Sequence, residues 1–366
     1  MKELSKLAQN VQASTTLAID ALAKQMKADG IDIVGFGAGE PDFNTPEHIK
    51  QAAIDAIHDD FTKYTPSSGI LPLKEAVCKR MEEDCGLHYE PSQVVVASGA
   101  KHNVYIALRA LIDPGDEVIL PAPYWVSYLE MIKMVGAQPV VVTATEAANF
   151  KMTAEQLEAI AAVCVKHGIY VIADEIYYGL LYDGVQFTSF PSLSDEVKYL
   201  TILINGVSKS YAMTGWRVGF ACANNTIAKV MSNFLSHSTG APSSISQKAA
   251  VAALDGPQGE VETMRQAFEK RRNYIVERIN AIDGVSCIKP EGAFYVMMSI
   301  EKLIGRTLHG QLIENSDDFC SAFLQHGLVA TVPGSGFGAP NYVRWSYATS
   351  MENIRKGMDR LEEFLK

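Results

Sequence analysis

Lys209 is the residue of this chain best placed to act as a nucleophile. It follows the strand-like run Tyr199–Ile204 and precedes a turn that contains Gly215, Trp216 and Arg217. A lysine just beyond the end of a buried strand loses contact with water, and desolvation favours the neutral amine over the charged ammonium. A neutral amine can form a Schiff base with a carbonyl group. The position of Lys209 therefore predicts Schiff-base chemistry.

Asp174 ends a second apolar run, Ile169–Ala173. In open α/β sheets, ligands bind beyond the carboxyl ends of the strands. A carboxylate at that place can keep the ring nitrogen of a bound cofactor protonated. The alternative is an acidic N-cap after a core strand, which is the better interpretation of Asp174 taken alone.

An anion site is predicted where the run Val94–Ala97 gives way to Ser98-Gly99-Ala100-Lys101. Backbone N–H groups at a helix start bind anions, and glycine allows a phosphate to approach closely. Arg217 can add a bidentate contact. Ser-Gly also caps many helices that bind no ligand, so this signal is weak by itself.

Two further side chains each have two interpretations. Arg344 lies between apolar neighbours in an expected strand, where it pairs either with a substrate carboxylate or with an internal acidic residue. Trp125 follows a strand end, and it either stacks on a planar ring or packs as a core aromatic. The glycine-rich run 35–39 is not a dinucleotide-binding loop, because Pro41 and Pro46 follow where that motif needs a helix.

These residues need a sheet to bring them together. Short Val/Ile-rich runs, most of them separated by segments of helical length, predict a mainly parallel α/β sheet with helices on both faces. The expected strands are Val94–Ala97, Glu117–Leu120, Pro139–Thr143, Ile169–Ala173, Leu200–Ile204 and Val218–Cys222, and the expected helices are Glu47–His58, Leu71–Glu83, Asn103–Leu111, Thr153–His167, Ser244–Leu254 and Val261–Ile282. Expected strands at Gly292–Ser299 and Tyr342–Tyr347 and expected helices at Asp317–His326 and Met351–Phe364 indicate a smaller α+β domain. The expected domains are 46–280 and, for the smaller one, 1–45 with 281–366.

Composition excludes several classes of protein. The 366 residues carry a formal net charge of -10, which argues against a nucleic-acid partner. The six cysteines form no CxxC pair, and the eight histidines form no HExxH motif, so no metal is expected. Scattered thiols suit a reducing compartment, and no run is long enough to span a bilayer. We expect a cytoplasmic protein without a membrane partner.

Taken together, the residues of these motifs and their order along the chain are more specific than any single motif. Over almost its full length the chain resembles the class I aminotransferases that depend on pyridoxal 5′-phosphate (PLP), and within them the aspartate aminotransferases. The matching stretches are Gly37–Phe43, Tyr64–Gly69, Gly99–Lys101, Tyr124-Trp125, Asp174–Tyr177, Ser208-Lys209, Met213–Arg217, Pro290–Tyr295, Pro333–Ser335 and Arg344. The fold that the resemblance implies is the PLP-dependent transferase fold type I.

The resemblance also implies roles for these residues. Lys209 forms the internal aldimine and then moves the proton between the substrate and the cofactor. Cofactor binding falls to Ala100, Lys101, Trp125, Asp174, Tyr177, Arg217, Tyr64 and Ser208. Among them, Asp174 pairs with the pyridine nitrogen and Tyr177 with the phenolic oxygen. Substrate binding falls to Gly39, Trp125, Arg344 and Lys101. Tyr64 reaches the phosphate of a neighbouring subunit, which implies a homodimer with shared active sites.

One departure from the family pattern bears on activity. Family members carry a further strand, ending in Asn-Pro-Thr-Gly or a similar run, before the strand that bears the aspartate. Here a single helix, Thr153–His167, leads from Pro139–Thr143 directly to Ile169. This helix begins like one family helix and ends like a later one, so a strand with its flanks is expected to be missing. In the family, the asparagine of that strand contacts the phenolic oxygen of the cofactor. Its loss is therefore expected to impair turnover more than cofactor binding.

The sequence therefore predicts transamination between an amino acid, most consistent with aspartate, and 2-oxoglutarate. Aromatic, alanine and prephenate aminotransferases fit the same scaffold. A PLP-dependent C–S lyase would share the lysine, the aspartate and the arginine of this site. A PLP-binding protein of low activity is consistent with the missing strand.

Overall fold

The computed structural model describes residues 3–12, 15–150 and 154–366. They belong to two compact units, which are described separately. The first unit contains Met1–Asp42, Pro114–Lys151 and Gln266–Lys366, and the second contains Phe43–Asp113 and Met152–Arg265. The domain limits expected from the sequence, 46–280 against 1–45 with 281–366, stay a prediction.

The second unit is built on a mixed sheet. Its described strands follow the order β2-β7-β6-β5, in which β5 is parallel to β6 and β7 is antiparallel to both β2 and β6. The elements are α3 (Glu47–His58), α4 (Leu71–Cys85), β2 (Val94–Ala97), α5 (Ala100–Leu111), α7 (Ala154–His167), β5 (Val171–Asp174), α8 (Asp195–Leu200), β6 (Thr201–Gly206), β7 (Gly219–Cys222), α9 (Asn225–Ser238) and α10 (Ser244–Asp255), with short 3-10 turns η1 (Pro91–Gln93), η3 (Phe190–Ser192) and η4 (Thr214–Trp216). The expected first residue of α7, Thr153, lies outside the described residues.

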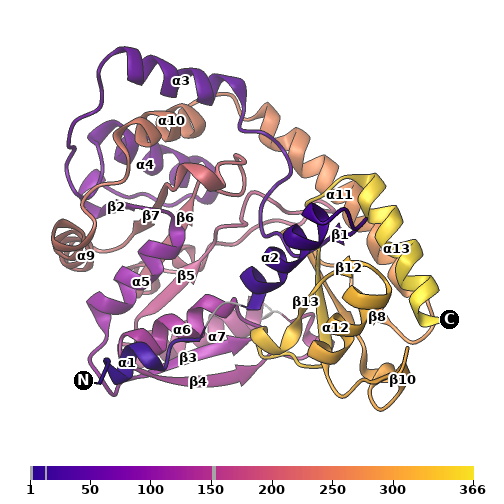
Figure 1. Ribbon diagram of the computed structural model, residues 1–366. Helices are drawn as coiled ribbons and strands as arrows, with labels where there is room; N and C mark the ends of the chain where they lie inside the picture. Colours follow the sequence, from indigo (N-terminus) through magenta and orange to yellow (C-terminus); the bar gives the residue numbers. More distant parts are fainter. Residues whose placement is uncertain (1–2, 13–14, 151–153) are drawn as a thin grey trace. The chain divides into compact units, whose positions relative to one another are not determined.

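Helices cover both faces of this sheet. Figure 1 shows α3, α4 and α10 on one side and α5 on the other. Leu73, Val77 and Met81 recur every four residues along α4, so they share one face of the helix, and they join a buried cluster with Val94 and Val96 of β2. Successive side chains of a strand point to opposite faces, so Val95, between these two valines, faces the α5 side. The α/β class expected from the sequence is confirmed.

The outer strand β5 and the pair β3–β4 are less enclosed than the centre of the sheet. In the described ranges β5 pairs with β6 alone, while β3 (Glu117–Ala122) and β4 (Gln138–Thr143), in the first unit, form a separate parallel pair. Every residue of β6 is buried, whereas every residue of β5 is half-buried. On β3 and β4, Ile119 is 64% exposed and Val142 is 52% exposed. Such apolar strands normally carry cover on both faces and on their edges.

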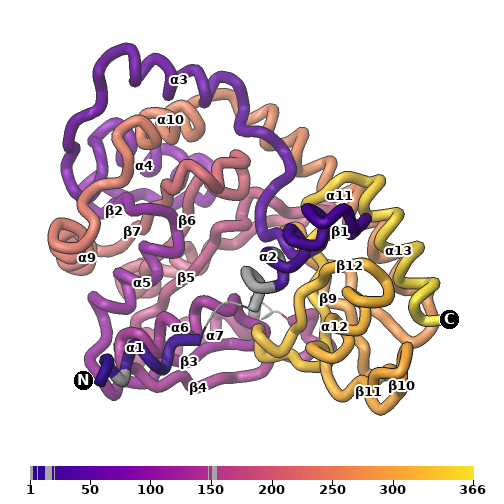
Figure 2. The backbone as a smooth tube through the Cα atoms, in the orientation of Figure 1, coloured from indigo at the N-terminus to yellow at the C-terminus, as the bar shows by residue number. Residues whose placement is uncertain are grey.

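The remaining elements of the first unit surround a small antiparallel sheet of order β13-β14-β9-β8. They are α1 (Lys6–Gln9), α2 (Thr15–Ala28), β1 (Val34–Gly35), α6 (Val126–Met134), η2 (Glu146–Ala148), β8 (Ser286–Cys287), β9 (Tyr295–Ser299), η5 (Glu301–Leu303), β10 (Thr307–Leu308), β11 (Gln311–Leu312), α12 (Ser316–His326), β12 (Val329–Ala330), β13 (Val332–Pro333), η6 (Gly334–Phe337), β14 (Tyr342–Ser346) and α13 (Met351–Leu365). The long helix α11 (Gly259–Asn280) belongs to both units. Figure 2 shows the N-terminal segment beside the C-terminal strands, where β1 pairs in parallel with β12.

Candidate active site

One edge of the mixed sheet gathers the residues that were predicted to bind the cofactor. Asp174, the last residue of β5, pairs with Ile204 of the parallel strand β6. Lys209 lies three residues beyond the end of β6, at Gly206. Both side chains therefore follow the carboxyl ends of neighbouring parallel strands, which is where open α/β sheets bind ligands.

Strand β7 brings the anion-binding residues to the same edge. Its first residue, Gly219, pairs with Ala97 at the end of β2 and with Gly206 at the end of β6. Arg217 lies two residues before Gly219, and the run 98–101 follows Ala97 directly. The antiparallel direction of β7 thus joins the turn that carries Arg217 to the start of α5.

The start of α5 and Arg217 form a positively charged cradle. A Cβ atom on Gly99, whose φ is +91°, would lie 2.6 Å from Nη2 of Arg217, so only glycine permits this approach. The Arg217 guanidinium donates to the carbonyl oxygens of Thr214 (3.0 Å) and Ser98 (3.3 Å). Burial, together with the nearby Arg217, lowers the pKa of Lys101.

Two cations are thus held beside the positive end of a 12-residue helix. Cations at a helix N-terminus are unfavourable, while an anion there is stabilised by the helix dipole and by the first N–H groups. The cradle therefore fits a phosphate group, which would relieve the repulsion between Lys101 and Arg217.

The loop that carries Lys209 is held from two sides. Thr45 donates its hydroxyl to the carbonyl oxygen of Ala212 at 2.7 Å and accepts from the indole N–H of Trp216 at 2.9 Å. Ser208 is buried, which restricts the movement of the backbone next to Lys209. A Cβ on Gly179 would lie 2.9 Å from Oγ of Ser210, so the loop after Tyr177 packs closely on the lysine loop.

Glu175 is a site neighbour for which no role was predicted from the sequence, although it lies between Asp174 and Tyr177. Its carboxylate accepts from the hydroxyl of Ser189 at 2.7 Å and from the backbone N–H of Phe190 at 2.9 Å. Burial raises the pKa of Glu175 to about 7, and the two hydrogen bonds oppose that rise. Glu175 thus anchors the turn after β5 through a carboxyl group that titrates near neutral pH.

Replacement of Glu175 by glutamine tests this titration. A raised pKa means that the folded state binds the proton more tightly, so the free energy of unfolding falls as the pH rises from about 4.5 through about 7. We expect Glu175→Gln to remove that part of the pH dependence. The free energy of unfolding of the variant, relative to that of the parent protein, should therefore increase by about 1–3 kcal/mol between pH 5 and pH 8.

Urea unfolding at the two pH values measures the effect. Glu75→Gln is the matched control, because Glu75 is an exposed glutamate on α4. Identical pH dependence in Glu175→Gln and in the parent would show that Glu175 does not titrate in this range.

In the first unit, Arg344 lies in β14 among aromatic rings. Its guanidinium carbon is 4.5 Å from the ring centre of Tyr295 and 4.7 Å from that of Phe337, and Nη2 donates to the carbonyl oxygen of Gly37 at 3.1 Å. A Cβ on Gly39 would lie 2.9 Å from the hydroxyl oxygen of Tyr295. Gly39 and Arg344 therefore meet around one tyrosine, and the planar arginine there suits a carboxylate.

The predicted residues Trp125 and Tyr64 belong to different units. Trp125 is the N-cap of α6 in the first unit, with its ring 5.3 Å from that of Tyr128. Tyr64 belongs to the second unit, and its side chain is fully exposed (108%). Ala100 and Lys101 begin α5.

The described residues contain no group of three or more metal-binding side chains. Nor does any helix in the described ranges have the length and apolar character needed to cross a membrane.

Comparison with known proteins identifies the family. The model of the class I and II aminotransferases matches residues 31–159 and 151–361. An aspartate aminotransferase of Geobacillus stearothermophilus is 45% identical, over 100% of this chain and 99% of the relative. The solved aspartate aminotransferase of Rhizobium meliloti superposes with a TM-score of 0.94 at 38% identity, covering 100% of this chain and 99% of that one. The solved aspartate aminotransferase of Thermus thermophilus with maleate superposes with a TM-score of 0.93 at 35% identity, covering 100% of both chains.

The fold and the lysine-bearing sheet edge define a transferase of fold type I. The chain belongs to the class I and II aminotransferases, as the family model and these relatives agree. The cofactor of this family is PLP, an aldehyde that carries a phosphate group. The residues present fit that cofactor, because the cation cradle of Arg217 and Lys101 matches the phosphate, and Asp174 and Lys209 share one sheet edge.

Proposed function

We propose that this aminotransferase transfers the amino group of aspartate to 2-oxoglutarate, with PLP held at the edge of the second unit's sheet. The cation cradle carries the proposal, because Lys101 and Arg217 lie together at the start of α5, where an anion such as the cofactor phosphate is stabilised. Several relatives at 38–45% identity bear the name aspartate aminotransferase, which supports aspartate as the substrate.

Each predicted cofactor residue has a task in this proposal. Lys101, Arg217 and the N–H of Ala100 bind the phosphate, and Ser208 supports the loop of Lys209. Asp174 keeps the pyridine nitrogen protonated, Tyr177 donates to the phenolic oxygen, and Trp125 stacks on the ring. When it is bound, PLP withdraws electrons from the substrate α-carbon.

The substrate residues orient the reacting bond and move its proton. Arg344 and the backbone at Gly39 bind the α-carboxylate, and the aromatic surroundings of Arg344 strengthen this pairing by limiting access of water. Lys101 is the proposed partner of the second carboxylate. With PLP bound, the Lys209 amine would take the proton from the substrate α-carbon and later release it to the cofactor.

Two coarser features complete the proposal. The full exposure of Tyr64 supports a role in a homodimer, in which Tyr64 reaches the phosphate site of the neighbouring subunit. The six cysteines are all free thiols, which supports a cytoplasmic location.

An absorbance spectrum with PLP, recorded before and after addition of aspartate, tests the function. We expect a band from the lysine-bound cofactor, which aspartate converts to that of pyridoxamine phosphate with one equivalent of oxaloacetate. Addition of 2-oxoglutarate should restore the first band. Pyruvate release without any 2-oxo acid acceptor would instead identify a C–S lyase, and an unchanged band would contradict transamination of aspartate.

A second candidate, a PLP-binding form of low activity, is supported by three observations. The family model matches in two parts that overlap at residues 151–159, at the start of the expected helix Thr153–His167, which is the seam where a strand is predicted to be missing. The alignment with the Geobacillus relative extends over 393 positions, against 366 residues in this chain, so at least 27 positions have no counterpart here. The half-buried strand β5 is consistent with a lost neighbour.

A further inference from the structure

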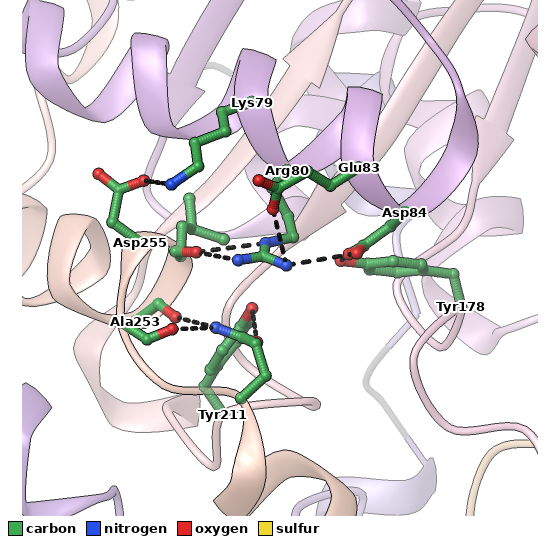
Figure 3. Close-up of polar contacts among 11 residues, drawn as sticks. Lys79, Arg80, Glu83, Asp84, Tyr178, Tyr211, Ala253 and Asp255 are labelled. Carbon is green, nitrogen blue, oxygen red and sulfur yellow. Dashed lines mark hydrogen bonds and ion pairs between the residues drawn. The ribbon is translucent and has the colours of Figure 1, made fainter.

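The C-terminal end of α10 lies at the centre of a polar network. The last carbonyl groups of a helix have no partner within it. Here Arg80 of α4 donates Nε and Nη2 to the carbonyl oxygen of Leu254, at 3.2 and 2.5 Å. The side-chain amide of Gln258 donates to the carbonyl oxygens of Ala253 (3.1 Å) and Gly256 (2.8 Å). Figure 3 shows these contacts converging on one turn.

The first arm of the network leads to Tyr177. Nη1 of Arg80 lies 3.3 Å from Oδ1 of Asp84, and the hydroxyl of Tyr178 donates to Oδ2 of Asp84 at 2.8 Å (Figure 3). Arg80 also lies 3.3 Å from Glu83, so it is held between two carboxylates. Burial raises the pKa of Tyr178 well above its usual value, so its hydroxyl stays a donor. Because Tyr178 is bonded to Tyr177, this arm fixes the turn from which Tyr177 extends.

The second arm leads to Lys209. The hydroxyl of Tyr211, two residues beyond Lys209, donates to Oε1 of Gln258 at 2.8 Å. Burial raises the pKa of Tyr211 to about 12, so this donor is also protonated at neutral pH. Tyr211 itself is buried, so the lysine loop has little freedom to move away from α10.

We propose that Asp84 and Gln258 are positioning residues of the active site, with the end of α10 setting the relative placement of Tyr177 and Lys209. Neither residue touches the cofactor; each acts through the tyrosine it binds. This inference rests on the proposed function, in which the Tyr177 hydroxyl donates to the phenolic oxygen of PLP. A network with a purely structural role would affect stability and leave the chemistry of the bound cofactor unchanged.

The test follows the pH midpoint of the absorbance change of bound PLP, together with the dissociation constant of PLP. A hydrogen bond to the phenolic oxygen favours its negatively charged form, so loss of that bond raises the midpoint. We expect Tyr178→Phe to raise the midpoint by about 0.5–1 pH unit and to weaken PLP binding about 3- to 10-fold.

Four further variants separate positioning from general damage. Asp84→Ala should reproduce the shift of Tyr178→Phe, and the double variant should shift no further, because both remove one contact. Asp84→Asn keeps an acceptor for the Tyr178 hydroxyl and should restore most of the parent midpoint. Lys79→Ala is the matched control, because the Lys79 ammonium pairs with Asp255 at the same helix end and its side chain is 54% exposed.

The outcomes are distinguishable. If Tyr178→Phe and Asp84→Ala keep the pH midpoint of the parent protein and only their melting temperatures fall, the positioning role is overturned. The proposed function is then unaffected. An equal shift in Lys79→Ala also overturns it, because the effect would then be a general one. If the parent protein gives no PLP band that depends on Lys209, the proposed function fails, and the inference built on it fails as well.

Discussion

Replacement of Lys209 by alanine is expected to lower kcat/KM for aspartate at least about 10³-fold and to abolish the absorbance band of lysine-bound PLP. The reason is that, in the proposed function, one amine would hold the cofactor covalently and would also move the α-proton of the substrate. The other proposed contacts of the cofactor lie on Asp174 and on the cradle of Arg217 and Lys101. PLP should therefore still bind to the variant, as the free aldehyde.

Two comparisons make this result specific. Lys50→Ala, which removes a half-buried lysine of α3, should keep both the band and the activity. Lys209→Arg keeps the positive charge but offers no nucleophile at neutral pH, so it should behave like Lys209→Ala. A small external amine should recover part of the lost rate, because it can replace the missing base. A persistent lysine-dependent band in Lys209→Ala would move the assignment to another lysine.

The sheet edge could be predicted because its signals are local. Asp174 and Lys209 each stand just after a short apolar run, and the rule that ligands bind beyond strand ends applies to each run separately. The sequence did not predict that β7 would be antiparallel, and this reversal joins Arg217 to the start of α5. Strand order and direction depend on contacts between distant segments, which no short pattern records.

The network behind the site was also beyond sequence reasoning. Asp84 and Tyr178 are 94 residues apart, and neither belongs to a recognisable motif. Helix α9, in contrast, was missed although its signal is present. Ile227, Met231 and Leu235 recur every four residues, and the side chain of Asn224 caps the helix by accepting from the N–H of Ile227.

Insertion of a relative's segment at residues 151–159 tests the proposed seam. The half-buried strand β5 offers one unpaired edge in the described structure, and an added parallel strand would bury it and supply its missing hydrogen bonds. Large apolar side chains near this seam are exposed, among them Ile169 (41% exposed) and Tyr170 (46% exposed). Their burial should raise the melting temperature by roughly 5 °C or more.

The same insertion should raise kcat about 10-fold, which corresponds to about 1.4 kcal/mol, because the family's asparagine adds a hydrogen bond to the phenolic oxygen of PLP. A second insert, with asparagine replaced by leucine, should keep the gain in melting temperature and lose the gain in kcat. An insert of equal length made of glycine and serine should give neither, since it cannot form a buried strand. If the relative's segment changes neither quantity, no strand is missing from this chain, and its activity is limited elsewhere.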